Sequence, residues 1–236
     1  MANVTDKLLQ EDLRRVVRRL PKDIIKLIQE KGIFLGGGFI RALVCGEKPN
    51  DIDLFGPSKD RIELCVELLQ KEGRKPRVLR TDNAITLIEP PRAAVQFITR
   101  WLYDDPRQCL REFDFTIAQA VVWWDESGWR SAVAPTFYAD LASRRLRYTQ
   151  PSRNEDAGGS MLRMRKFLGR GYHVSADDLA LLMARVTVKM TQHPNFNAIA
   201  TSENEQADIL RGLLREVDPM LVVDGIDPVE VDHEDQ

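Results

Sequence analysis

The sequence is poor in cysteine and has no long hydrophobic run. Its three cysteines, Cys45, Cys65 and Cys109, are far apart and lack the spacing of a zinc site or of a disulfide framework. The N-terminus lacks the apolar core of a signal peptide, and no apolar stretch is long enough to span a membrane. These absences exclude a disulfide-stabilised secreted domain and a membrane-spanning protein, and they predict a cytoplasmic location.

Charge of neither sign dominates the chain. The 236 residues include 34 Lys and Arg against 36 Asp and Glu, a formal net charge of -2. Residues 216–236 hold eight of the acidic residues and no Lys or Arg, so the rest of the chain has a net charge of +6. A basic body with an acidic tail is typical of proteins that handle polyanions. A solvated, flexible C-terminus explains the same segment equally well.

Hydrophobic periodicity predicts an α+β fold followed by a helical region. Helical spacing of apolar residues predicts helices at 5–31 (interrupted at Pro21), 39–45, 59–71, 104–111, 155–170, 176–192 and 202–216. Short apolar or alternating runs predict strands at 33–35, 51–55, 75–80, 84–88, 94–99, 116–124 and 145–148. The change of character at Pro151 predicts four parts. They are N-terminal helices (1–32), a mixed head (33–150), a helical neck (151–216) and a flexible acidic tail (217–236).

Three glycines, Gly36 to Gly38, separate a predicted strand from a predicted helix. Glycine lets a backbone approach a ligand closely, and the amides at a helix N-terminus point outward. This arrangement favours phosphate, and Arg41 in the first turn adds a charge-assisted contact. Taken alone, the glycines also fit an ordinary tight turn.

Two carboxylates, Asp51 and Asp53, follow on the next predicted strand. The two-residue period of a strand places both on one face of the sheet. Paired hard oxygen ligands suit Mg²⁺, which usually retains water and substrate phosphates. The spacing therefore predicts a divalent-metal site, although two such residues also occur at solvated strand edges.

This segment resembles the signature of the class II CCA-adding enzyme and bacterial poly(A) polymerase family, within the DNA polymerase β nucleotidyltransferase superfamily. That family has a Gly-Gly-x-x-Arg turn followed by an Asp-x-Asp strand. The matching positions are Gly37, Gly38, Arg41, Asp51 and Asp53. The family usually has Asp directly after the arginine, where this chain has Ala42.

Further segments are similar to family motifs in the same order. Asp114-Phe115-Thr116-Ile117 resembles the Arg-Arg-Asp-Phe-Thr-Ile-Asn motif, which implies that Asp114 and Thr116 contact the nucleotide ribose. Phe113 stands where the second arginine of that motif is expected. The segments 140–147 and 162–167 resemble the end of the head and the first neck helix, so the resemblance covers roughly residues 30–175.

Two departures concern catalysis. The superfamily commonly has a third carboxylate on a later strand, and the equivalent position here is Gln96, which carries no charge. CCA-adding enzymes also have a Glu-Asp-x-x-Arg motif in the neck that pairs with the incoming base. Asp177 and Asp178 are the nearest acidic pair, but Leu181 stands where the arginine is expected.

The resemblance implies a polymerase-β-like head, a mixed sheet with helices, and metal-dependent transfer of an NMP from an NTP. Asp51 and Asp53 would hold two Mg²⁺ ions, with Mn²⁺ as an alternative. Nucleotide contacts are expected from Gly37, Gly38, Arg41, Asp114, Thr116, Arg163 and Lys166. The favoured acceptor is an RNA 3′ end (tRNA or a fragment), with Arg144, Arg145 and Arg147 as RNA contacts.

Other interpretations stay open. The acceptor of the same reaction is alternatively a protein side chain or a small molecule. Gln96 favours a further alternative, a nucleotide- or RNA-binding module with weak or no turnover. The basic residues from Arg144 to Arg170 are alternatively a solvated helix face, whereas the interspersed Tyr148, Phe167 and Tyr172 favour a groove that binds RNA or triphosphate by stacking and charge. The tryptophans Trp123, Trp124 and Trp129 are assigned to core or hairpin packing.

Overall fold

The computed structural model describes residues 6–71, 76–152, 157–197 and 202–215. The chain divides between Ser143 and Arg144 into two compact units, each considered by itself. The first unit is a mixed sheet with helices, and the second is largely helical, so the predicted α+β class is confirmed. The predicted acidic tail, 217–236, lies outside the described residues.

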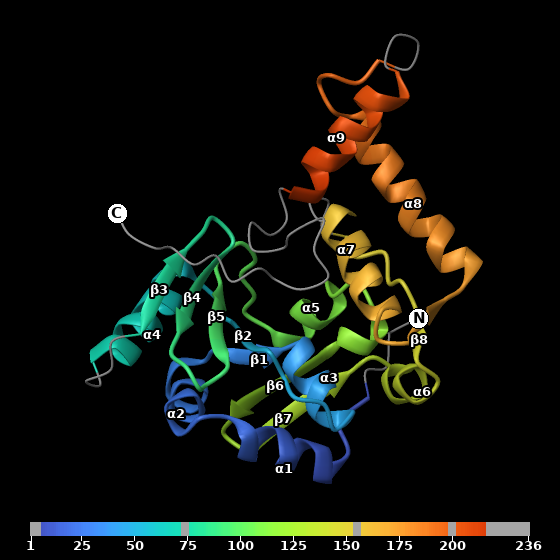
Figure 1. Ribbon diagram of the computed structural model, residues 1–236. Helices are drawn as coiled ribbons and strands as arrows, with labels where there is room; N and C mark the ends of the chain where they lie inside the picture. The colour runs from blue at the N-terminus through green and yellow to red at the C-terminus, as the bar shows by residue number, and fades with distance from the viewer. Residues whose placement is uncertain (1–5, 72–75, 153–156, 198–201, 216–236) are drawn as a thin grey trace. The chain divides into compact units, whose positions relative to one another are not determined.

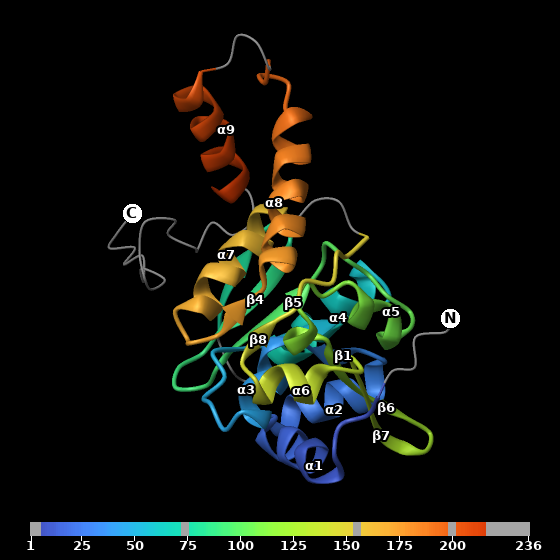
Figure 2. The same ribbon diagram turned by 90° about the vertical axis from the view of Figure 1, so that its right-hand side faces the viewer.

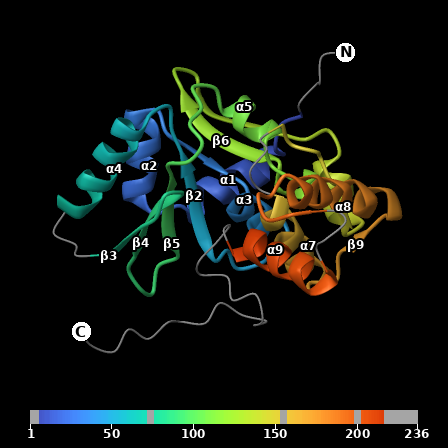
Figure 3. The ribbon, with the colours of Figure 1, turned by 90° about the horizontal axis from the view of Figure 1, so that it is seen from above.

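A seven-stranded sheet organises the first unit in the order β3-β4-β5-β2-β1-β6-β7. Its strands are β1 (Phe34–Gly36), β2 (Asp51–Phe55), β3 (Arg77–Arg80), β4 (Ala84–Ile88), β5 (Ala94–Ile98), β6 (Ala120–Asp125) and β7 (Gly128–Val133). The pair β2 and β5 is parallel, and the other neighbouring pairs are antiparallel. Figure 3 shows β3, β4, β5 and β2 in this order, seen from above.

The helices of the first unit begin and end at residues with clear local causes. Asp105 accepts a hydrogen bond from the Arg107 amide at 2.9 Å, and Pro106 occupies the first helical position of α5. Gly32 ends α2 in the left-handed conformation, with φ of 64°. The helices are α1 (Gln10–Arg19), α2 (Lys22–Lys31), α3 (Gly38–Val44), α4 (Lys59–Lys71), α5 (Pro106–Arg111), the 3-10 helix η1 (Thr116–Ala118) and α6 (Phe137–Ala142).

The two faces of the sheet differ in burial. On β2, β4 and β5, alternate residues are buried, as the two-residue period requires. The buried set includes Ile52, Ile85 and Phe97, with α4 packed against β5. The residues between them, including Asp53 and Gln96, are only partly buried.

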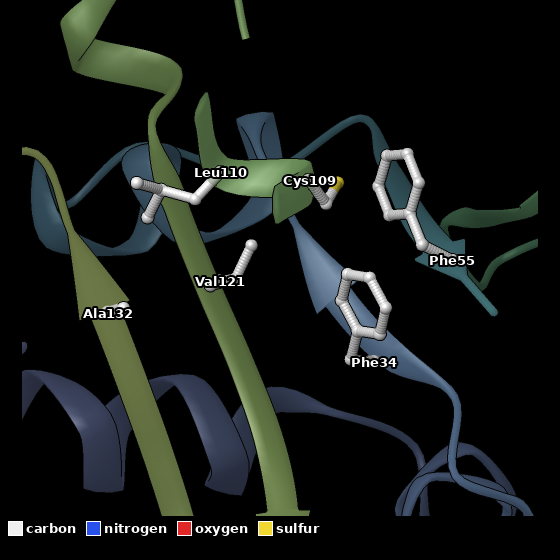
Figure 4. Packing of buried hydrophobic residues seen from close by; sticks show 6 residues of the cluster. All are labelled: Phe34, Phe55, Cys109, Leu110, Val121 and Ala132. Carbon is white, nitrogen blue, oxygen red and sulfur yellow. The ribbon is translucent and has the colours of Figure 1, made fainter. Parts of the chain in front are cut away.

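On this second face, α5 covers the half of the sheet made by β1, β6 and β7. Figure 4 shows the core beneath it, where Cys109 and Leu110 of α5 face Phe34, Phe55 and Val121. The Phe34 and Phe55 rings stack with centroids 5.7 Å apart. Figure 1 places α1 and α2 on the opposite side of these strands from α5. The first unit therefore has helices on both sides of β1 and β6.

Most predicted elements are present, and several have the predicted bounds, among them β2, β4 and α4. The strand predicted at 116–124 begins only at Ala120, because Thr116–Ala118 forms η1. The sequence did not predict β7 or α6. In β7, the polar Ser131 is 6% exposed and accepts a hydrogen bond from the Leu8 amide, so its burial depends on tertiary contact.

The second unit contains α7 (Ala157–Leu168), α8 (Ala176–Thr191), α9 (Glu203–Arg215) and a two-stranded sheet of β8 (Arg145–Leu146) and β9 (His173–Val174). The three helices contact one another, and Figure 2 shows α8 and α9 side by side. Because β8 pairs with β9, the residues directly after Ser143 belong to the second unit with these helices. Across the described ranges, no helix has the length and apolar composition needed to cross a membrane.

Candidate functional site

The glycine turn connects β1 to α3 at the centre of the sheet. Gly37 has φ of 75° and ψ of -130°, a backbone conformation that L side chains rarely adopt. Its amide donates to the Ala120 carbonyl at 2.9 Å, which fixes the turn against β6. A Cβ atom added to Gly38 would meet no atom within 4 Å, so the backbone is accessible there. Gly38 and the first-turn amides of α3 are therefore better placed for an anion than the Gly37 amide.

Phe113 lies against this turn. A Cβ atom on Gly36 or Gly37 would come within 3.0 Å of the Phe113 ring, and one on Gly36 would also come within 3.0 Å of Phe55. The Phe113 and Phe55 rings meet edge to face with centroids 5.8 Å apart. Where the resembling family has an arginine, this chain has an aromatic ring that requires glycine beneath it.

Arg41 is on the inner side of α3. Its side chain is 4% exposed, and its Nη1 donates to Glu47 Oε2 at 2.8 Å. Glu47 is 40% exposed. The pair connects α3 to the loop before β2, so Arg41 stabilises the turn. A contact of Arg41 with phosphate stays a prediction. It would require the guanidinium to bind Glu47 and the ligand at the same time.

The strand register brings a row of residues together across the sheet. Gly36 of β1 is opposite Asp53 of β2, Asp53 is beside Gln96 of β5, and Gln96 is opposite Thr86 of β4. Paired residues on neighbouring strands lie on the same face, about 5 Å apart. Asp51 is two residues from Asp53 and shares this face, partly buried like its neighbour. The predicted carboxylate pair is thus adjacent to the glycine turn.

The residues of this row fit a Mg²⁺ ion bound together with a nucleotide. Asp51 and Asp53 supply carboxylate oxygens and Gln96 a neutral carboxamide beside them. Mg²⁺ typically takes one or two carboxylates and completes its shell with water and substrate phosphate. Within residues 6–71, 76–152, 157–197 and 202–215, no group of three or more His, Cys, Asp or Glu side chains could hold a metal by itself. Water and ligand oxygens would supply the other positions around an ion held by the two aspartates.

The other predicted nucleotide contacts of the first unit are deeply buried. Asp114 is 2% exposed and Thr116 is 6% exposed. The Thr116 hydroxyl donates to Asp140 Oδ2 at 2.6 Å, and the Thr136 hydroxyl donates to the same oxygen at 2.6 Å. This buried network connects η1 to α6. Ribose contacts from Asp114 and Thr116 stay predictions.

In the second unit, the predicted basic contacts lie on β8, on the residues directly before and after it, and on α7. Arg144 donates to the Arg170 carbonyl at 3.1 Å, and Arg145 is 3.7 Å from Asp178. Arg147 and Arg163 are partly buried, and the predicted Lys166 is exposed. Their roles toward RNA or nucleotide stay predictions.

The interspersed aromatic residues of this unit are core residues. Tyr148, Phe167 and Tyr172 are 5%, 8% and 6% exposed, so they do not offer stacking surfaces for bases. Asp178, the nearest acidic residue to a base-reading motif, is 7% exposed and accepts hydrogen bonds from the Tyr148 amide and the Ser175 hydroxyl. It stabilises the joint between β8 and α8.

Two features of the first unit were missed from the sequence. Thr86 is the neighbour of Gln96 on β4. Its position between the apolar Ile85 and Leu87 could have indicated that it points to the same face as Gln96. The run Arg14-Arg15-Val16-Val17-Arg18-Arg19 was assigned only to a helix, although its helical spacing places the arginines on the outer side.

Comparisons with known proteins give a family and a similar fold. The family model described as "Gad2: Gabija anti-defense 2 family protein" matches residues 2–144. No curated protein matches the chain.

Solved structures of CCA-adding and tRNA-processing enzymes have a similar fold. A Thermotoga maritima CCA-adding enzyme complexed with tRNA is 18% identical, with a TM-score of 0.54 over 88% of this chain and 51% of that one. A CCA-adding enzyme in complex with ATP is also 18% identical, with a TM-score of 0.54 over 88% of this chain and 50% of that one. A tRNA-processing enzyme in an apo form is 23% identical, with a TM-score of 0.53 over 84% of this chain and 59% of that one. The chain therefore spans between half and three fifths of these enzymes, and the likeness supports a nucleotidyltransferase fold.

Proposed function

The chain belongs to the Gabija anti-defense 2 family, and from this premise we propose that it is a metal-dependent nucleotidyltransferase. It would transfer an NMP from an NTP to a hydroxyl, with an RNA 3′ end as the favoured acceptor. One observation carries the proposal. Gly36, Asp53 and Gln96 are neighbours across three strands, with Asp51 on the same face, so the pair of carboxylates adjoins a glycine turn whose backbone is open at Gly38.

The proposed roles follow from the chemistry of each residue. Asp51 and Asp53 would hold Mg²⁺, which, when bound, neutralises phosphate charge and lowers the pKa of a coordinated oxygen. Gly38 and the first-turn amides of α3 would bind the β- and γ-phosphates, and Arg41 would secure the turn from inside through Glu47. Gly37 would allow the positive-φ turn and leave room for the Phe113 ring, and Gly38 would leave the backbone open toward the phosphates.

In the transfer step, the acceptor oxygen forms a bond to the α-phosphorus, the bond to the β-phosphate breaks, and pyrophosphate leaves. Gln96 stands beside Asp53 and cannot take the hydroxyl proton, because a carboxamide is not basic at neutral pH. The proton would pass to water. We therefore propose slow turnover, of which Gln96 is the cause.

Two alternatives have specific support. The family description as anti-defense favours an acceptor that belongs to the defence system, including a protein side chain. Gln96 favours a module that binds NTP without turnover.

The test incubates the protein with each α-labelled NTP, Mg²⁺ and pooled RNA. Asp53→Asn should lower label transfer by about 10³-fold or more, since the metal would lose a charged ligand. Asp60→Asn is the matched control, because Asp60 is an exposed carboxylate on α4.

Label on RNA that is lost in Asp53→Asn but retained in Asp60→Asn supports the main proposal. Label on protein supports the defence-component acceptor, and NTP binding without transfer supports the binding module. If the wild type neither binds NTP nor transfers label, the proposed function is wrong.

A further inference from the structure

A groove on the first unit lies away from the glycine turn and the carboxylates. It has a volume of about 460 Å³ and lies between α1 and the hairpin of β6 and β7. Leu13 and Val17 of α1 and the pair Trp124 and Trp129 of the hairpin form its apolar lining. Figures 1 and 2 both show α1 alongside this hairpin. Trp124 is 37% exposed, which is unusual for so large an apolar side chain.

The strand register places this groove on the opposite face of the sheet from Asp53. Asp53 is opposite Gly36, and Gly36 is opposite Val121, so these three share one face. Trp124 is three residues after Val121 on the same strand and therefore points to the other face. A ligand in the groove would be separated from the carboxylates by the sheet.

Arginines of α1 border the groove. Arg14 and Arg18 line it, and Arg15 and Arg19 continue the surface on the next rows of the helix, together with the acidic Glu11. Arg15 also lies 3.9 Å from Asp12. Arg15 donates to the Leu43 carbonyl at 3.3 Å. In the part of the chain that the structure describes, the side chains of Arg14, Arg18 and Arg19 form no ion pair or hydrogen bond, and all three are exposed. Their charges are available to an anion from outside.

The spacing of these arginines fits a regular polyanion. Residues four apart on a helix are separated by roughly 6 Å along its axis, so Arg14 with Arg18 and Arg15 with Arg19 form two parallel pairs of charges. A phosphodiester strand carries evenly repeated charges with a flat apolar base beside each one. Proteins that bind single strands combine such a basic track with aromatic side chains on which bases stack. An acidic protein surface would match the charge but would not need the exposed tryptophan face.

We propose that the groove between α1 and the β6–β7 hairpin binds single-stranded nucleic acid, with bases against Trp124 and Trp129 and phosphates at Arg14 and Arg18. This site is separate from the proposed transfer site and does not depend on it. It also assigns a function to the arginine run of α1, which the glycine and carboxylate motifs leave unexplained.

The test measures fluorescence anisotropy of a labelled oligouridylate of about twelve nucleotides with the full chain at several salt concentrations. The double variant Arg14→Gln with Arg18→Gln should bind at least fivefold more weakly at low salt. The slope of log affinity against log salt should fall by roughly 1.4, because two phosphate contacts are lost. Trp124→Leu should weaken binding by about tenfold and reduce the quenching of tryptophan fluorescence by the strand.

The matched control is Lys22→Gln with Lys26→Gln, which removes two exposed charges at the same spacing from α2. It should keep the wild-type affinity within about twofold, apart from the general effect of net charge. All four basic side chains are exposed, so thermal melting should be unchanged in both double variants.

Three results would overturn the proposal. In the first, the Arg14 and Arg18 variant binds as tightly as the α2 control. In the second, Trp124→Leu binds as tightly as the wild type, which would leave only general charge attraction. In the third, polyglutamate of equal charge displaces the oligonucleotide as well as unlabelled oligouridylate does, which would identify the groove as a surface for acidic protein.

Discussion

One face of the seven-stranded sheet has two halves with different chemistry. On β1, β6 and β7, the face is covered by α5, and Phe34, Val121 and Ala132 are buried beneath it. On β2, β5 and β4, the same face carries Asp53, Gln96 and Thr86, all partly exposed. In both halves, successive side chains of a strand point to opposite faces of the sheet. The cover provided by α5, rather than the strand pattern, decides which half is core and which half is available to a ligand.

The junction between the halves is the glycine turn. Gly36 ends the covered strand β1 and is also opposite Asp53. The Phe113 ring reaches the turn from the covered side and would meet any side chain there. The aromatic core of Phe55 and Phe113 therefore ends at Gly36, and the partly buried carboxylates begin on the neighbouring strand.

The largest expected effect is on the covered half. Phe34→Ala should destabilise the protein by about 3–5 kcal/mol, because it leaves a cavity beside Phe55 under α5. Thr86→Ala, on the partly exposed half, should cost less than about 1 kcal/mol. Equilibrium urea titration of both variants measures the difference. Equal losses would show that the second half of the face is also packed core.

The next effect concerns catalysis in the partly exposed half. Gln96→Glu restores a carboxylate beside Asp53 and should raise the proposed transfer rate by about 100-fold, equivalent to about 2.7 kcal/mol. Gln96→Asn is the control and should give no gain. The initial rate of label transfer measures both. An unchanged rate in Gln96→Glu would contradict the assignment of slow turnover to Gln96.

Thiol reactivity should show a smaller difference. Cys109 is buried on the inner side of α5 and Cys65 is buried in α4, whereas Cys45 is exposed. Burial raises the pKa of the Cys65 thiol to about 11, which also reduces its reactive thiolate. Ellman's reagent should therefore modify one thiol per chain at least tenfold faster than the other two. Cys45→Ser should remove the fast phase, and a fast phase that persists would mean that α5 or α4 opens readily.

The smallest effect is at the edge strand β3, which an ion pair connects to α4. Arg80 donates to both oxygens of Glu63, at 2.6 and 2.9 Å. The hydrogen bond from Arg80 lowers the pKa of Glu63 below 4.5, although both side chains are largely exposed. Glu63→Gln should cost at most about 1 kcal/mol at neutral pH, because solvent screens the pair.

The sign of the pH dependence follows from that lowered pKa. The contribution of Glu63 is present above pH 4.5 and is lost as the pH falls through its folded-state value. Urea titrations at neutral pH and at about pH 3 should therefore show a smaller difference between wild type and Glu63→Gln in acid. A difference that grows in acid would contradict this sign.

Much of this arrangement could be predicted from local pattern. The alternation in 51–55 predicted both the strand β2 and the shared face of Asp51 and Asp53, because side-chain direction in a strand depends only on sequence spacing. The helix α4 and the strand β4 had equally clear periodicity and have the predicted bounds.

Other features depended on partners far away in the sequence. The strand β7 contains a buried serine, Ser131, whose hydroxyl accepts a hydrogen bond from the Leu8 amide. The local sequence therefore lacks the apolar alternation that would have predicted this strand. Trp124 packs edge to face against Trp129 in the hairpin, as predicted, with ring centroids 5.4 Å apart. Its exposure beside α1 was not predicted, because it depends on how the hairpin meets a helix more than a hundred residues earlier.

The sequence by itself determined most of the helices and strands, the glycine turn and the common face of the two aspartates, because these depend on backbone conformation and on periods of two and 3.6 residues. Only the tertiary structure decided that Gln96 stands beside Asp53, that Phe113 closes over Gly36, and that Arg41 pairs with Glu47. It also decided that the arginines of α1 border a tryptophan groove. These relations join segments that are distant in the chain, and strand register and packing bring them together.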